Sequence, residues 1–150
     1  MKLICKVSPV ICFTFIFGYF SPFNSLAQKS DTTDIEQTIE KYIAGWRTAN
    51  ADLLKEAFDL DAGIVLWVDN SGESEQLKSM ELSELTNRNK PIDDYGIGYK
   101  IQSLQIIDTR LAIAFVKIPL KSSYYIDCLE LQKINSQWKI VLKSFVYFQK

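Results

Sequence analysis

Residues 123–148 read SYYIDCLELQKINSQWKIVLKSFVYF, and this stretch decides the fold. Two runs rich in apolar, β-branched and aromatic residues flank the dipeptide Asn135-Ser136. Such runs are typical of strands, and a polar dipeptide between them is typical of a tight turn. The stretch therefore predicts a long antiparallel hairpin with a two-residue loop, its strands covering 123–134 and 137–148.

The two-residue loop determines which residues of this hairpin face each other. The predicted partners are Leu131 and Ile140, Leu129 and Leu142, and Asp127 and Ser144. In this register one face is buried and apolar, formed by Leu129, Leu131, Trp138, Ile140 and Leu142. The other face is exposed and polar, formed by Glu130, Gln132, Lys139 and Lys143. Because side chains alternate along a strand, the carboxylate of Asp127 is expected to point inward with the apolar set.

A β-bulge would change this assignment for part of the hairpin. Phe145 and Tyr147 share their parity with Lys143, so the simple register exposes two aromatic rings. A bulge beyond Leu142 is therefore the alternative.

A second hairpin is predicted immediately before the first. Its strands cover 99–107 and 111–120, on either side of the turn Asp108-Thr109. The predicted partners across a two-residue loop are Leu104 and Ile113, and Ile106 and Leu111. Together these residues form one strongly apolar face.

Helices are predicted to precede the strands. Thr33 and Glu36 form a capping-box pattern, and apolar residues then recur at helical spacing as far as Trp46. Asn50 is placed to cap a second, short helix that ends near Phe58. The remaining segments are read as a buried strand over 64–68, a third short helix over 79–88 and a loop over 89–95. This order predicts an α+β domain whose helices cover one face of an antiparallel sheet.

Composition limits both the number of domains and the chemistry. The chain has 150 residues, of which 47% are hydrophobic, and this suits a single domain with a packed core. It has no histidine, which excludes Ser-His-Asp and Cys-His catalysis and histidine metal sites. With a net charge of −1 it lacks the basic surface that nucleic acids require. Asp59 and Asp61 lack the other ligands of a calcium loop, so no metal site is predicted.

The first 27 residues are organised like a cleaved secretory signal. Lys2 and Lys6 precede an apolar run over 7–20, and Ser25 and Ala27 supply the small residues that signal peptidase requires. The apolar run is shorter than the ~20 residues of a membrane-spanning helix.

Cleavage after Ala27 divides the chain into a signal peptide, 1–27, and one mature domain, 28–150. We expect this domain in the periplasm or outside the cell, without membrane attachment, and with a frayed polar segment over 28–33. Cys128 is then its single cysteine, so the domain has no internal disulfide.

Two motifs resemble a known family. The first is Tyr42-x3-Trp46-x3-Asn50-x-Asp52-x-Leu54-x3-Phe58 followed by Asp61-Ala62, and it is similar to the start of the nuclear transport factor 2-like (SnoaL-like) superfamily. The second is Asp127-x-Leu129-x-Leu131-x-Lys133-x5-Lys139-Ile140-x2-Lys143-x-Phe145, with Trp138 before Lys139. It is most similar to the putative lumazine-binding branch of that superfamily.

The resemblance implies a cone-shaped α+β fold in which a curved antiparallel sheet packs against N-terminal helices and encloses a pocket. Relatives include isomerases, dehydratases and cyclases, as well as members that only bind. In the isomerase pattern an acid on the penultimate strand donates a hydrogen bond to an oxyanion, and Asp127 matches that position. The base aspartate of the pattern aligns near Val65 or Leu66, which are apolar, so no catalytic residue is assigned.

We therefore expect an exported domain that binds a small apolar or aromatic molecule, with no cofactor and no assigned chemistry. One alternative is a small-molecule isomerase, dehydratase or cyclase that uses Asp127, so enzyme activity is left open. The other is an interaction module with a filled cone that forms a homodimer through its sheet. The residues expected at the pocket are one acid and five aromatic residues, namely Asp127, Tyr42, Trp46, Trp67, Phe115 and Tyr125. A structural hydrogen bond is the alternative role for the acid, and core packing is the alternative for the aromatic residues.

The mature protein should begin at Gln28, because Ser25 and Ala27 satisfy the small-residue requirement of signal peptidase. The intact mass of the exported protein measures this directly. A chain that is found in the membrane fraction with residues 1–27 still attached would contradict the assignment.

Overall fold

The computed structural model describes residues 23–69, 72–87, 90–92 and 98–150, with side chains from residue 29 onward. The predicted signal segment up to residue 22, and most of the predicted loop over 89–95, lie outside these ranges. The elements are α1 (Phe23–Thr48), α2 (Ala51–Ala57), β1 (Ile64–Asp69), β2 (Gln76–Glu81), the 3-10 helix η1 (Leu82–Asn87), β3 (Lys100–Ile106), β4 (Leu111–Pro119), β5 (Ser123–Ile134) and β6 (Gln137–Gln149).

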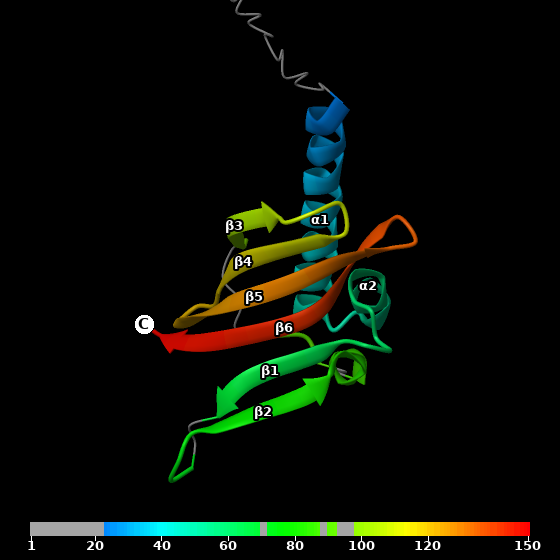
Figure 1. The fold of residues 1–150 in the computed structure, drawn as a ribbon. Helices are drawn as coiled ribbons and strands as arrows, with labels where there is room; N and C mark the ends of the chain where they lie inside the picture. The colour runs from blue at the N-terminus through cyan, green and yellow to red at the C-terminus, as the bar shows by residue number, and fades with distance from the viewer. Residues whose placement is uncertain (1–22, 70–71, 88–89, 93–97) are drawn as a thin grey trace, which may run out of the picture.

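The strands form one curved six-stranded sheet in the order β2-β1-β6-β5-β4-β3 (Figure 1). Neighbouring strands pair antiparallel except β1 and β6, which run parallel. The sheet is therefore mixed, and the expectation of a wholly antiparallel sheet is wrong for this pair. Helix α1 crosses the strands on one face, so the predicted α+β class is confirmed.

Helix α1 presents one apolar face to the sheet. Ile35, Ile39 and Ile43 on this face are at most 2% exposed, as the helical spacing predicts. The helix begins at Phe23, well before the predicted capping box. Thr33 lies inside the helix, where its hydroxyl donates to the carbonyl of Lys29 at 3.2 Å, so the predicted helix start is wrong.

The turn between the two helices has the predicted cap. The side-chain oxygen of Asn50 accepts hydrogen bonds from two backbone N–H groups in the first turn of α2. Gly45 lets the helices approach closely, because a Cβ at this position would lie 3.0 Å from the side chain of Leu54. In the described part of the chain, neither helix is both long and apolar enough to cross a membrane.

The β5–β6 hairpin has the predicted two-residue loop and also one β-bulge. Asn135 and Ser136 have φ angles of 50° and 66°, as in a type I′ turn. Leu131 pairs with Ile140 as predicted. In the next step Glu130 pairs with Leu142, so Val141 is an extra residue in β6.

This bulge reverses the faces of β6 beyond Val141. Leu129 pairs with Lys143 instead of Leu142, and Asp127 pairs with Phe145. Lys143 is therefore buried, although the simple register places its side chain in solvent. Because β5 itself is regular at this point, the predicted inward direction of Asp127 is unchanged and its side chain is 0% exposed.

The β3–β4 hairpin differs from its predicted register by one residue. Leu104 pairs with Ala114 and Ile106 with Ala112, because the loop is longer than two residues. A one-residue slip moves a side chain to the opposite face. Phe115 consequently points away from the helices and is 41% exposed.

The segment predicted as a third helix divides into two elements. Its first residues complete the edge strand β2, and only Leu82–Asn87 form a helical turn, of 3-10 type. Leu82 and Leu85 are buried under this turn. The spacing of apolar residues therefore predicts the helical turn Leu82–Asn87 correctly, but it does not predict the strand β2.

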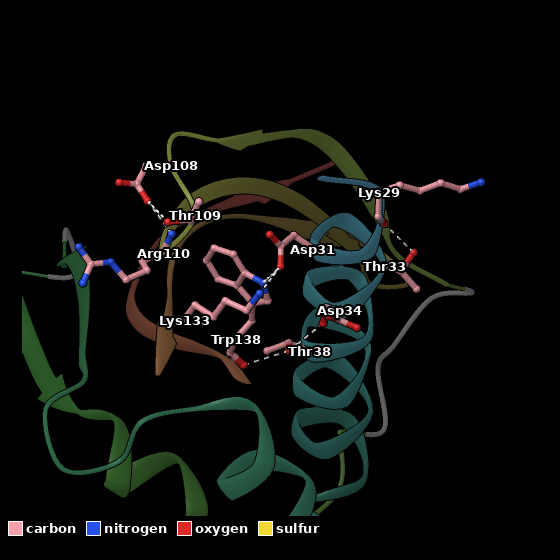
Figure 2. A network of polar contacts seen from close by, with 10 residues as sticks. All are labelled: Lys29, Asp31, Thr33, Asp34, Thr38, Asp108, Thr109, Arg110, Lys133 and Trp138. Atoms are coloured by element: carbon pink, nitrogen blue, oxygen red, sulfur yellow. Dashed lines mark hydrogen bonds and ion pairs between the residues drawn. The ribbon is translucent and has the colours of Figure 1, made fainter. Parts of the chain in front are cut away.

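A partly buried ion pair joins the first part of α1 to the loop end of the β5–β6 hairpin (Figure 2). The carboxylate of Asp31 accepts a hydrogen bond from the ammonium of Lys133 at 2.5 Å and one from the indole N–H of Trp138 at 3.1 Å. Burial by itself raises the pKa of the Asp31 carboxyl, but these two hydrogen bonds outweigh it and hold the pKa below its ordinary value. The expectation that 28–33 is frayed is therefore wrong at Asp31.

Asp31→Asn should lower the free energy of unfolding at pH 7 by about 1 to 3 kcal/mol, because an amide replaces the charged acceptor of one buried and one partly buried hydrogen bond. The carboxyl has a lower pKa in the folded protein than in the unfolded chain. Its contribution is therefore complete above about pH 4 and disappears as the pH falls through the folded-state pKa.

Urea unfolding of both proteins at pH 7 and at pH 3 measures this difference. The exposed neighbour variant Asp34→Asn should stay within about 0.5 kcal/mol of the wild type. A destabilisation by Asp31→Asn that is equally large at both pH values would contradict the assigned role of the carboxylate.

Candidate functional site

A cavity of about 310 Å³ lies between the helices and the sheet. Its lining residues come from α1, η1 and five strands, and they are Tyr42, Trp46, Val65, Met80, Glu84, Leu85, Ile118, Tyr125, Lys143 and Phe145. Most of these side chains are apolar or aromatic, and two are charged. The volume is at the lower end of the range of roughly 300–1,000 Å³ for small-molecule sites.

Three polar side chains from three different elements form a buried cluster beside the cavity. The ammonium Nζ of Lys143 on β6 lies 2.6 Å from Oδ1 of Asp127 on β5. The hydroxyl of Tyr42 on α1 donates a hydrogen bond to Oδ2 of Asp127 at 2.5 Å. Burying a carboxylate is costly unless a counter-charge and hydrogen bonds accompany it, and Asp127 has an ion pair with Lys143 and a hydrogen bond from Tyr42.

Lys143 and Tyr42 line the cavity, whereas Asp127 lies behind them. Asp127 is 0% exposed and Lys143 is 6% exposed. Asp127 therefore acts on the cavity through its two partners, and the polar surface that a ligand would meet belongs to Lys143 and Tyr42.

The ammonium of Lys143 has unusual surroundings for a lysine. Its Nζ lies 4.5 Å from the ring centroid of Phe145 and 5.6 Å from that of Tyr42, distances typical of cation–π contacts. Burial lowers the pKa of Lys143, and the charge and hydrogen bond of Asp127 oppose this effect without cancelling it, so the pKa stays below its ordinary value. An ammonium has three N–H donors, and among the described residues the polar contact of this one is its ion pair with Asp127. The other donors can serve a ligand.

Aromatic rings form a continuous wall beside this group. Trp46 meets Tyr125 edge-on with centroids 5.6 Å apart, and Tyr125 meets Phe145 at the same distance. Trp67 stacks on the far side of this row, with its centroid 6.0 Å from that of Phe145. The wall offers both faces and edges to a flat molecule.

The structure brings most of the sequence-predicted site residues together. Tyr42, Trp46 and Tyr125 line the cavity, and Trp67 is attached to its edge through Phe145. Phe115 lies on the opposite face of the sheet, so the cavity is built without it.

Two charged residues of the cavity, Lys143 and Glu84, are not among the site residues predicted from the sequence. The bulge at Val141 brings Lys143 inside, and the parity of Phe145 and Tyr147 was the one signal for it. Glu84 belongs to η1, where its Oε1 accepts a hydrogen bond from the backbone N–H of Glu81 at 3.3 Å. Glu84 is therefore a second carboxylate at the site besides Asp127. The lack of a second acid is thus no argument against catalysis.

The surroundings of the cavity give less support to isomerase chemistry, metal binding or a reactive thiol. Val65 lines it at the position where the isomerase pattern has its base. Within the described ranges no cluster of three or more potential ligands among His, Cys, Asp and Glu could hold a metal ion. Asp59 instead accepts hydrogen bonds from the backbone of Asp61 and Ala62. The free thiol of Cys128 does not line the cavity.

Residues 30–146 match the model of a protein family described as "Putative lumazine-binding". Among solved structures, a nuclear transport factor 2-like protein of unknown function from Shewanella baltica OS155 is 17% identical with a TM-score of 0.67, and the match covers 81% of this chain and 96% of that one. A protein of the same description from Silicibacter pomeroyi DSS-3 is 14% identical with a TM-score of 0.62, covering 80% and 98%.

A type 2 hexachlorocyclohexane dehydrochlorinase has the same fold, with 11% identity, a TM-score of 0.59 and coverage of 82% and 88%. At these identities the similarity to solved structures shows the fold alone. No curated protein matches the sequence significantly.

Lys143→Met should lower the free energy of unfolding by about 3 to 5 kcal/mol, because it leaves the carboxylate of Asp127 buried without its counter-charge. Adding Asp127→Asn to this variant should restore most of the loss, since the amide can still accept the hydrogen bond of Tyr42. Urea unfolding of the single and double variants, with the exposed Lys100→Met as control, measures both effects. A single variant as stable as the wild type would show that the two charges are not paired inside the protein.

Proposed function

We propose, since this chain belongs to the nuclear transport factor 2-like superfamily and to its family described as putative lumazine-binding, that it binds a small, partly aromatic molecule in the cavity beside Lys143. The observation that carries this proposal is the position of one buried ammonium at an otherwise largely apolar wall. Pockets of this kind bury an apolar body and use a few polar groups for orientation.

The chemistry of the wall describes the ligand. The row of Trp46, Tyr125 and Phe145 suits a flat ring system. The N–H donors of Lys143 suit an acceptor on that ring, such as a carbonyl, a phenolic oxygen or a ring nitrogen. Lumazine, which the family description names, is a flat bicyclic ring with carbonyl oxygens and so belongs to this class of compound.

Export of the mature domain is part of the proposal. The family match starts at residue 30, and the first buried side chain in the described part of the chain is that of Asp31. Cleavage after Ala27 would thus leave every described buried side chain in the domain. The proposed place of action is the periplasm or the space outside the cell.

A catalytic role is the second candidate. Lys143, with a pKa below its ordinary value, and Glu84 border the same cavity and supply ionisable groups without histidine. A dimerising module with a filled cone is less well supported, because the cavity beside Lys143 is open.

Met80→Trp should weaken the binding of 2-naphthol by about tenfold or more, because Met80 lines the cavity and the larger side chain takes up space that the ring needs. The matched variant Leu77→Trp lies on the same strand, where Leu77 is 71% exposed, and it should keep the wild-type affinity. Isothermal titration calorimetry measures both affinities. Equal loss in the two variants, or absence of binding to the wild type, would refute the proposed site.

The ligand itself tests the role of the ammonium. Naphthalene lacks the oxygen of 2-naphthol and should bind the wild type about tenfold more weakly, as expected for a lost hydrogen bond to a charged donor. Equal affinities for the two compounds would mean that Lys143 does not contact the ligand.

A further inference from the structure

The amine of Lys143 has the surroundings of a nucleophile. A lysine can attack a carbonyl carbon when its amine is neutral, a base is in reach and the substrate is held beside it in a desolvated site. Lys143 is 6% exposed, Asp127 Oδ1 lies 2.6 Å from its Nζ, and its side chain borders a cavity of about 310 Å³.

The protonation state of Lys143 supports this role. At the ordinary lysine pKa only about one amine in 2,500 is neutral at pH 7. Burial holds the pKa of Lys143 below that value despite the opposing charge of Asp127, which increases the neutral fraction. The same burial keeps bulk water away from the amine.

The carboxylate of Asp127 is placed to accept and return one proton. It already faces the ammonium of Lys143 through Oδ1, while its Oδ2 is held by the hydroxyl of Tyr42. Tyr42 is a positioning residue in this arrangement, because it fixes the orientation of the carboxylate behind the amine.

From this geometry we infer that Lys143 forms an imine with an aldehyde or ketone bound in the cavity, an inference that rests on the small-molecule binding proposed above. The carbonyl compound has an aromatic or apolar body that packs against Trp46 and Tyr125. Its carbonyl carbon lies next to Nζ of Lys143, in position for attack by the amine.

The step balances without an oxidant or a reductant. Asp127 takes one proton from the ammonium, and the lone pair of Nζ forms a bond to the carbonyl carbon while the C=O π electrons move to oxygen. A second proton passes from nitrogen to that oxygen and gives a carbinolamine. Asp127 then returns its proton to the hydroxyl, water leaves, and a protonated C=N bond remains with its positive charge beside the carboxylate.

Reductive trapping of the wild-type protein tests this inference. The protein is incubated with 2-naphthaldehyde and sodium cyanoborohydride at pH 7, and the modified lysines are identified by peptide mass spectrometry. Lys143 should gain a naphthylmethyl group about tenfold faster or more than the exposed Lys55 and Lys100, because its neutral fraction is larger and the ring is held beside it. Adding 2-naphthol should slow the reaction at Lys143 and leave Lys55 and Lys100 unchanged.

Two variants provide the controls. Lys139 lies on the same strand, but its ammonium donates to the backbone carbonyls of Lys55 and Glu56 outside the cavity. Lys139→Arg should therefore keep the fast reaction, and the double variant Lys143→Met with Asp127→Asn should lose it.

The outcomes separate this inference from the proposed binding. If 2-naphthol binds to the cavity but Lys143 reacts no faster than Lys55, the imine inference is overturned and the binding proposal stands. If 2-naphthol does not bind and Lys143 stays unmodified, both are overturned. A fast reaction that persists in the double variant also overturns the imine inference.

Discussion

The ion pair of Lys143 and Asp127 is the interaction on which the site depends. It joins β6 to β5, and the hydrogen bond from Tyr42 extends it to α1, so one carboxylate fixes three elements around the cavity. Buried ion pairs contribute little net stability, but removing one partner is costly, so each charge holds the other in place. The result is an ammonium at a defined position on an apolar wall, which can orient a ligand.

A second ion pair, which is partly buried, complements the first along α1. Asp31, in the first part of the helix, binds Lys133 and Trp138 at the loop end of the β5–β6 hairpin (Figure 2). Tyr42 contacts Asp127 further along the helix. The apolar face of α1 packs between these two points. Polar contacts therefore set the position of the helix on the sheet, and apolar burial supplies the driving force.

The sequence was sufficient for the fold class, the Asn50 cap and the pairing of Leu131 with Ile140, because these follow from local turn chemistry and alternation. It was not sufficient for the faces of β6. The parity of Phe145 and Tyr147 indicates a bulge but does not locate it at Val141, and this extra residue moves Lys143 from solvent to the cavity. The same sensitivity to one residue in the β3–β4 loop misplaced Phe115. The register of two strands is fixed by the length of their loop and by packing. The alternation of apolar and polar residues does not determine the loop length.

The most direct test of the central claim is a crystal structure of the protein with 2-naphthol bound. The account predicts that the ring lies against Trp46 and Tyr125, with its oxygen within about 3.2 Å of Nζ of Lys143, the ordinary limit of a hydrogen bond. Density for the ring on the outer face of the sheet near Phe115, with the cavity beside Lys143 unchanged, would contradict it.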